Sequence, residues 1–368
     1  MKITFLMTYA GMSGGTRVIV TQAQELMARG HEVRVFTTPP PTPGFRRTVS
    51  SLLHGNGWPK ITKAGESFFD GSGVPHTVLP KFRPFTNHDL PDADVVIATW
   101  WQTAEWVWRL APSKGAKAFF IQHYETWGGD PKEVDAAWRL PLRKIVISHW
   151  LADFARDKFG DADVSLVPNS VDMNLFHAPP RSRQKRPTVG LLYNRLWFKG
   201  CDVALKAIET AAQQIPDLQL IAFGQEPPRH WMPLPTGAQY STKPSQETIR
   251  DIYSQCDVWL CGSRAEGFHL PPLEAMACRC PVVSTRVGGP MDTIEEAKNG
   301  FLVDVEDHDA LADRLVRVLK LSDPQWQAMS DAAYATACRY SWRDAAELME
   351  KALETAIERS RTARRIGA

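Results

Sequence analysis

The stretch SRAEGFHLPPLEAMACRCPVVST, residues 263–285, decides the fold that we expect for this chain. The apolar run DVWLCGS before its loop indicates a buried strand, and PVVST at its end indicates the next one. Pro271 and Pro272 suit the first turn of a helix, where a missing N–H costs nothing and φ is already near helical. The residues LEAMAC then continue the helix with good helix formers. Strand, loop, helix and strand in this order predict one βαβ step of a parallel sheet, and therefore an α/β protein.

Two carboxylates, Glu266 and Glu274, bracket the loop and the opening of this helix. Ligands of open parallel sheets bind beyond the carboxyl ends of the strands, where helix amides favour an anion such as a diphosphate. Glu274 is a candidate clamp for the two hydroxyls of a ribose, and Glu266 is a candidate clamp for a sugar or for the loop itself. The alternative is a capped helix with two solvated acids. The amides available to an anion, since the prolines have none, are those of Gly267, Phe268, His269, Leu270 and Leu273.

The string EGFHLPPLEAMACRCPVVST resembles the Glu-x7-Glu signature of the retaining glycosyltransferases of family four, which have the GT-B fold. Two residues depart from the usual pattern: His269 stands where Gly or Ser is common, and Arg279 where Gly is common. The resemblance implies two Rossmann-like parallel-sheet domains facing a central cleft. It also implies that the nucleotide sugar binds the second domain and the acceptor the first. His269 bears on the identity of the donor sugar more than on the fold.

Composition and charge are those of an ordinary globular protein of two domains. The chain has 368 residues, of which 43% are hydrophobic and 23% charged, which excludes extended disorder. A net charge of +2 gives no reason to expect nucleic acid as a partner. The six cysteines show no zinc-binding spacing, and we expect them to be small buried residues of a reduced, cytoplasmic protein. No run of 18 apolar residues indicates a membrane span, and the first residues indicate a strand rather than a signal peptide.

The first domain, residues 1–178, opens with a strand over 2–9, a glycine turn, a helix over 16–30 and a second strand over 31–38. The turn lacks the dinucleotide-binding pattern. It resembles the family's opening, in which a Gly-Gly pair lies across the cleft from the donor phosphates. The resemblance therefore implies that Gly14 and Gly15 contribute to the donor site; the alternative is a tight turn without a ligand.

Residues 44–83 form an irregular segment with six basic and two acidic residues. An apolar stripe near Arg46 and Arg47 would suit an acceptor loop or contact with a membrane surface. The alternative is a solvated excursion that covers the domain. A peripheral position at the inner membrane face would be compatible with the first reading.

The strand AKAFFIQHYETW places His123 at its carboxyl end, with Glu125 behind it. The resemblance implies that His123 touches the transferred sugar; the alternative is a histidine that faces the core. Seven of the thirteen tryptophans fall between residues 100 and 150, and those near strand ends are candidates to stack on sugar rings: Trp100, Trp101 and Trp127. Two Asp-x-Asp pairs, at 92–94 and 161–163, precede strands rather than follow them, and we therefore predict no metal site.

The second domain, residues 187–341, follows the basic, proline-bearing linker HAPPRSRQKRP. Its first strand leads into NRLWFKG, which resembles the family's "GR…KG" phosphate segment with Asn194 in place of Gly. Arg195 and Lys199 would stabilise the negative charge that grows on a leaving diphosphate. The alternative is two exposed cations on a loop. A last helix within residues 342–368 is expected to cross back to the first domain.

Taken as implied by the resemblance, the chain is a retaining glycosyltransferase with His123, Arg195, Lys199 and Glu266 in catalytic roles. It would move a sugar from a nucleoside-diphosphate sugar to a glycan, a lipid-linked or a small-molecule acceptor by front-face attack. We expect neither a metal nor any other cofactor. The competing functions are a sugar-nucleotide epimerase or phosphorylase on the same fold, and a non-catalytic scaffold that binds nucleotide sugars.

Overall fold

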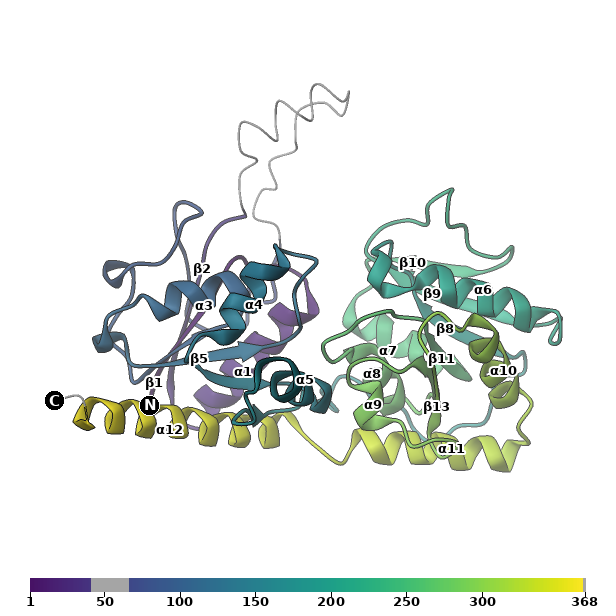
Figure 1. Ribbon diagram of the computed structural model, residues 1–368. Helices are drawn as coiled ribbons and strands as arrows, with labels where there is room; N and C mark the ends of the chain where they lie inside the picture. Colours follow the sequence, from purple (N-terminus) through teal and green to yellow (C-terminus); the bar gives the residue numbers. More distant parts are fainter. Residues whose placement is uncertain (41–65, 367–368) are drawn as a thin grey trace, which may run out of the picture. The chain divides into compact units, whose positions relative to one another are not determined.

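The computed structural model describes residues 1–40 and 66–366, and the chain forms two compact units, Met1–Val167 with Arg343–Ala368 and Pro168–Trp342 (Figure 1). Each unit contains one parallel sheet with helices packed on it, as the sequence predicts. The two units are described in turn.

The first unit has a seven-stranded parallel sheet in the order β3-β2-β1-β4-β5-β6-β7. Its central strands are apolar and wholly buried, because helices cover both faces of such a sheet. The strands are β1 (Lys2–Met7), β2 (Glu32–Thr37), β3 (His76–Val78), β4 (Val95–Ala98), β5 (Ala116–Ile121), β6 (Arg143–Val146) and β7 (Ser165–Leu166). The helices are α1 (Gly14–Ala28), α3 (Trp101–Trp108), α4 (Pro131–Arg139), α5 (His149–Phe159) and α12 (Trp342–Ile366).

Helix α1 begins at Gly14, earlier than the sequence predicts, so placing Gly14 and Gly15 in a turn before the helix is wrong. Gly14 and Gly15 are its first two residues, and the hydroxyl of Ser13 caps it by accepting the N–H of Thr16 at 3.2 Å. The amide of Gln122 donates to the carbonyl of Gly15 at 3.3 Å. The start of α1 therefore lies beside the end of β5, where His123 is found.

The second unit has a six-stranded parallel sheet in the order β10-β9-β8-β11-β12-β13. Its strands are β8 (Thr188–Leu192), β9 (Gln219–Gly224), β10 (Gln239–Thr242), β11 (Val258–Cys261), β12 (Val282–Thr285) and β13 (Gly300–Val303). Its helices are α6 (Cys201–Ala212), α7 (Gln246–Ser254), α8 (Leu270–Ala277), α9 (Pro290–Thr293), α10 (His308–Leu319) and α11 (Asp323–Ala337). The βαβ step predicted from residues 263–285 is confirmed as β11-α8-β12.

Strand order reverses in this sheet between β8 and β11, which pair directly although β9 and β10 follow β8 in the chain. Ligands of doubly wound sheets bind at such a switch point, outside the carboxyl ends of the two strands. The loops that leave β8 and β11 there carry Lys199 and Glu266.

The short helix α9 ends at Thr293, because the Asn299 side chain ties the following turn through the N–H of Glu295 (2.8 Å) and the carbonyl of Thr293 (2.9 Å). The boundary between the units falls near residue 167 rather than between 178 and 187. Residues 168–178 pack with the second unit, where the Arg279 side chain donates to the carbonyl of Ala178 at 3.0 Å.

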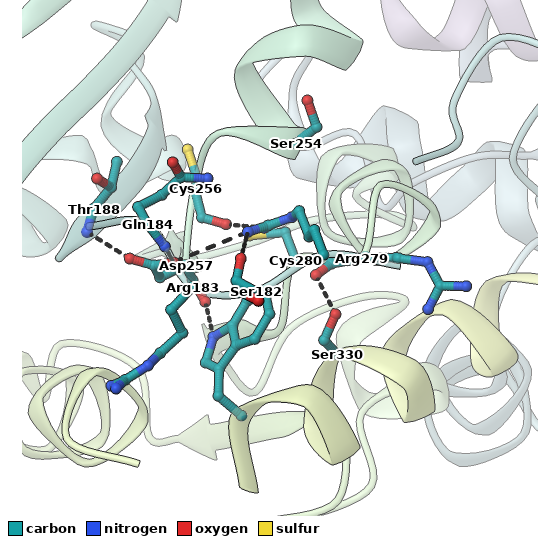
Figure 2. A network of polar contacts seen from close by, with 12 residues as sticks. Ser182, Arg183, Gln184, Thr188, Ser254, Cys256, Asp257, Arg279, Cys280 and Ser330 are labelled. Atoms are coloured by element: carbon teal, nitrogen blue, oxygen red, sulfur yellow. Dashed lines mark hydrogen bonds and ion pairs between the residues drawn. The ribbon is translucent and has the colours of Figure 1, made fainter. Parts of the chain in front are cut away.

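A buried polar network around Asp257 fixes the chain that leads into β8. The Asp257 carboxylate accepts the N–H groups of Gln184 at 2.8 Å and Thr188 at 2.9 Å (Figure 2). The indole N–H of Trp326, on α11, donates to the Asp257 carbonyl at 2.9 Å. Asp257 directly precedes β11 and so lies at the end of the strand opposite Glu266. We assign this network to structure rather than to ligand binding.

Helix α12 belongs to the first unit. Arg29, after α1, pairs with Glu347 at 3.1 Å and with Glu350. Farther along the helix, Arg359 pairs with Asp163 next to β7. Among the described residues, no helix is both long enough and apolar enough to cross a membrane.

The cysteines follow the sequence expectation with one exception. Five of the six are buried, whereas Cys338 is exposed.

Candidate active site

A glycine brings the loop after β8, which carries the sequence NRLWFKG, against the end of β11. Lys199 ends a short 3-10 turn, and Gly200 follows with φ of +52° as the residue before α6. A Cβ at Gly200 would overlap the carbonyl oxygen of Gly262, so only glycine fits both the left-handed backbone and the close approach. This contact places Lys199 next to the loop after β11.

Lys199 and Glu266 form an ion pair at this point, in which the carboxylate is buried and the ammonium is partly exposed. The ammonium of Lys199 lies 2.9 and 2.8 Å from the two carboxylate oxygens, and the hydroxyl of Ser263 donates to the first of them at 2.8 Å. Glu266 is 6% exposed. Because three hydrogen bonds satisfy the carboxylate, it is held in one orientation.

The environment keeps Glu266 ionised. Burial raises its pKa, but His269, Lys199 and Ser263 together lower the pKa below its usual value. Burial also lowers the pKa of His269 to about 4, against the attraction of Glu266, so His269 is neutral at pH 7. The positive charge that stabilises the Glu266 carboxylate at neutral pH is therefore that of Lys199.

His269 occupies the N-cap of α8 with φ of +73°, a left-handed conformation that is costly for residues other than glycine. Its Nε2 atom lies 3.6 Å from Glu266, and its buried Nδ1 atom has no hydrogen-bond partner. Protonation would leave a buried N–H at Nδ1 unsatisfied, which agrees with the low pKa.

Arg279, the second departure from the family pattern, is also left-handed, with φ of +62°. Its guanidinium pairs with Asp331 and lies 4.2 Å from the ring centre of Tyr334. These contacts, with the hydrogen bond to Ala178, offset the backbone strain that a glycine would avoid. Both departures thus fall where the backbone itself favours glycine.

Glu274 lies on α8 and is 4% exposed. The hydroxyl of Tyr253, on α7, donates to its carboxylate at 2.9 Å. Glu266 and Glu274 are therefore both buried, and the alternative of two solvated acids is wrong.

Gly267, Phe268 and Leu270 lie between the two acids, and all three are buried. A Cβ at Gly289 would lie 2.6 Å from the carbonyl oxygen of Phe268. The Gly288-Gly289 pair therefore packs directly against the loop between β11 and α8, where a larger side chain would not fit. No role was predicted for these two glycines, although their position shortly after β12 was a signal.

Arg264 is a second support that the sequence analysis missed. Its guanidinium holds both carboxylate oxygens of Asp202 at 2.8 Å and also pairs with Glu306. The loop between β11 and α8 is thereby tied to α6 and to the chain after β13.

Arg195 lies apart from this cluster. Its side chain is 51% exposed and pairs with Glu226 at 2.9 Å. The structure therefore brings together Lys199, Glu266 and His269, whereas Arg195, expected beside Lys199, has another partner.

His123 lies in the first unit, just beyond β5, and is half-buried. Its Nδ1 atom is 3.0 Å from the carbonyl of Tyr124, and its ring packs edge-on against Trp127 at 4.3 Å between centres. Glu125 is 4% exposed and accepts the N–H of Trp101 at the start of α3, at 3.1 Å. Burial raises the pKa of Glu125 well above its usual value. Glu125 thus anchors the loop behind His123.

The two Asp-x-Asp pairs lie before their strands, and an aspartate of each forms an ion pair with a lysine side chain of the same unit. Asp92 pairs with Lys114 at 2.9 Å, and Asp161 with Lys144 at 2.6 Å. In the described part of the chain, no three His, Cys, Asp or Glu residues gather as a metal site would require.

The fold is that of the glycosyltransferases of the GT-B type. The solved structure of HepE from Anabaena in complex with UDP is similar over 96% of this chain and 100% of that chain, with a TM-score of 0.73 at 16% identity. The sucrose-phosphate synthase of Thermosynechococcus elongatus is similar over 96% and 98%, with a TM-score of 0.69 at 18% identity.

The family follows from the sequence comparisons. Residues 12–175 match the model described as Glycosyltransferase Family 4, and residues 173–336 match that of Glycosyl transferases group 1. The chain belongs to glycosyltransferase family 4. It is 27% identical to the D-inositol 3-phosphate glycosyltransferase of Mycolicibacterium paratuberculosis over 96% of this chain and 88% of that protein. The counterpart from Corynebacterium urealyticum is 33% identical over 41% of this chain and 38% of its own length.

The depressed pKa of His269 predicts a pH-dependent loss of stability that His269→Asn should remove. Asn tolerates the left-handed backbone but does not titrate. In the wild type, His269 has its usual pKa of 6.5 in the unfolded chain and a pKa of about 4 in the folded chain. Between these two pH values the unfolded chain binds a proton at His269 and the folded chain does not. Stability is therefore complete above pH 6.5 and falls as pH drops toward 4, by about 2 kcal/mol at pH 5.

Thermal unfolding at pH 7 and pH 5 checks this prediction. The midpoint of the wild type should fall further than that of His269→Asn, by on the order of 5 °C. Parallel shifts of the two proteins would show that His269 titrates normally in the fold.

Proposed function

We propose that this chain transfers a sugar from a nucleoside-diphosphate sugar to a hydroxyl of an acceptor, with retention of the anomeric configuration. The observation that carries the proposal is the Lys199–Glu266 pair at the strand-order reversal of the second unit. An ammonium, a fixed carboxylate and the start of α8 converge there on the edge of the sheet at which such folds bind phosphates.

In the proposed reaction the bond between the anomeric carbon and the diphosphate oxygen breaks, and negative charge grows on the leaving phosphate. Lys199 and the amides of Gly267 and Phe268 stabilise that charge, and Arg195 exchanges Glu226 for a phosphate oxygen. The acceptor oxygen forms the new bond on the same face of the sugar and passes its proton to the leaving phosphate. Glu266 faces the positive charge of the oxocarbenium-like state.

Glu274 is proposed to bind the ribose, and its contact with Tyr253 fixes the carboxylate for that task. His123, at the end of β5, is proposed to contact the transferred sugar, with the start of α1 at Gly14 and Gly15 beside it. The relatives named above include a protein with an inositol phosphate in its name, which supports a polyol acceptor. A glycan or a lipid-linked sugar has the same hydroxyl chemistry.

A cytoplasmic location, with contact to the inner membrane face, completes the proposal. The basic segment 44–83 motivated the membrane contact, but residues 41–65, including Arg46 and Arg47, lie outside the described part of the chain. Binding to anionic vesicles that weakens with added salt would support the contact.

The function is tested by a screen of nucleoside diphosphates and their sugars by thermal shift, beginning with UDP. The best donor is then incubated with candidate acceptors, and proton NMR reads the anomeric configuration of the product. Release of free nucleotide only with acceptor supports transfer. Interconversion of the donor sugar without acceptor would indicate an epimerase, release of a sugar phosphate a phosphorylase, and binding without turnover a scaffold.

We predict that transfer requires no divalent cation. Lys199 and the amides at the start of α8 supply the positive potential that a metal provides elsewhere. Dialysis against EDTA should leave the rate unchanged, and added Mg²⁺ or Mn²⁺ should not raise it. Loss of transfer in EDTA and its return with either ion would contradict this account of the diphosphate site.

A further inference from the structure

An open depression of about 450 Å³ lies along the outward face of α5 in the first unit. It is lined by Trp150, Asp153, Phe154, Asp157 and Lys158. These positions recur every three or four residues, so they share one face of the helix. We call this surface the α5 groove.

A run of aromatic rings joins the α5 groove to the end of β5. The exposed Trp127 packs edge-on against His123, whose ring centre lies 6.0 Å from that of Trp150. Trp150 in turn lies 5.9 Å from Phe154. The groove therefore adjoins His123, the residue that we propose to contact the transferred sugar.

The loop that carries Trp127 is built rigidly. A Cβ at Gly128 would overlap the ring of Trp100, and one at Gly129 would overlap the ring of Trp101. Both glycines therefore lie flat against indoles, and no larger side chain fits. Exposed aromatic surface on a fixed support is what a stacking site requires.

The charged groups of the groove compensate one another. Arg156 pairs with Asp153 at 2.7 Å and with Asp157 at 2.9 Å, and Lys158 pairs with Asp135 at 2.9 Å. With three carboxylates and two cations, this surface carries no excess positive charge and does not attract a polyphosphate or an anionic membrane.

The exposed carboxylates of the groove can exchange hydrogen bonds with hydroxyl groups, and the half-buried Trp150 offers apolar ring surface, whereas the Phe154 ring packs against Tyr124 and lies under the Lys158 ammonium. This combination matches the faces and edges of pyranose sugars.

We propose that the α5 groove binds the neutral pyranose chain of the acceptor at a distance from the sugar that reacts. The inference rests on the proposed function and narrows the acceptor class from any hydroxyl compound to a neutral glycan of several sugars. Trp150 stacks on a pyranose face, with Phe154 packed behind it, and Asp153 and Asp157 accept hydrogen bonds from the sugar hydroxyls.

A printed array of neutral and anionic glycans, probed with the labelled full-length protein, tests the proposal. The wild type should bind a set of neutral glycans, and Trp150→Ala should weaken that binding about tenfold. The double variant Asp153→Asn, Asp157→Asn keeps the side-chain volume and should weaken it as well. Trp108→Ala is the control, because Trp108 is an indole on the surface of α3, outside the groove, and is more exposed than Trp150.

Binding to no glycan, or only to anionic ones, would overturn the proposal, as would equal loss in Trp108→Ala and Trp150→Ala. The thermal shift with UDP is recorded for every variant. An unchanged shift together with absent glycan binding refutes the groove alone, whereas absence of any nucleotide shift in the wild type refutes the proposed transfer. Unfolding midpoints show whether Trp150→Ala folds. If it does not, the glycan binding of the double variant Asp153→Asn, Asp157→Asn decides whether the groove binds the acceptor.

Discussion

Lys199→Met should lower the free energy of unfolding of the second unit by about 3–5 kcal/mol, because it leaves the buried carboxylate of Glu266 without its cation. The effect should depend on pH. In the wild type the pKa of Glu266 is lowered, so the pair contributes its stability above the unfolded value of 4.5 and loses it as the pH falls. The gap between the two proteins should therefore narrow as the pH falls below 4.5. Urea unfolding at several pH values measures it.

The double variant Lys199→Met, Glu266→Gln is the control for this prediction. It removes both charges while keeping the volumes, so most of the lost stability should return. If the double variant is as unstable as Lys199→Met alone, packing rather than the buried charge explains the loss. Neither variant should retain transfer activity, since both lack the proposed cation on the leaving phosphate.

Glu274→Ala should weaken UDP binding by about 2–3 kcal/mol, or roughly 30- to 150-fold, if its carboxylate accepts both hydroxyls of the ribose. The fold should persist, because Glu274 lies within α8 and alanine is the strongest helix former. Titration calorimetry measures the affinity.

Two comparisons isolate the ribose contact. Tyr253→Phe removes the hydroxyl that orients Glu274 but leaves the carboxylate, so it should cost less affinity than Glu274→Ala. The nucleotide whose ribose lacks the 2′-hydroxyl should bind the wild type more weakly but bind Glu274→Ala with nearly the same affinity as UDP. Unchanged UDP affinity in Glu274→Ala would rule out the ribose role.

The sequence predicted the parts of the fold that depend on local periodicity. Strand β11, helix α8 and strand β12 follow from two apolar runs and from Pro271 and Pro272, and these signals lie within 30 residues of one another. The position of Glu266 at the carboxyl edge of a parallel sheet followed in the same way. Local patterns thus located the site.

The partners of the site residues were not predictable from local patterns. The Lys199–Glu266 pair joins residues 67 positions apart, and it depends on the left-handed Gly200 and on the close approach of Gly262. Arg195 was expected beside Lys199 because the motif has both, but the choice between Glu226 and a phosphate depends on what is bound. Likewise, His269 could be identified as unusual, but its left-handed backbone is seen only in the structure, and its neutral state follows from its burial there.

Helix α12 has a consequence for the order in which the molecule is made. The first unit is discontinuous, because residues 343–366 leave the ribosome only after the whole of the second unit. At about 5–20 residues per second, synthesis of residues 168–342 separates the two parts by roughly 9–35 s. During that interval the surface that binds α12 is uncovered. Arg29 then lacks its partners Glu347 and Glu350, and Asp163 lacks Arg359. The second unit can therefore complete its core first, and a nascent chain stalled before residue 343 exposes apolar surface to chaperones.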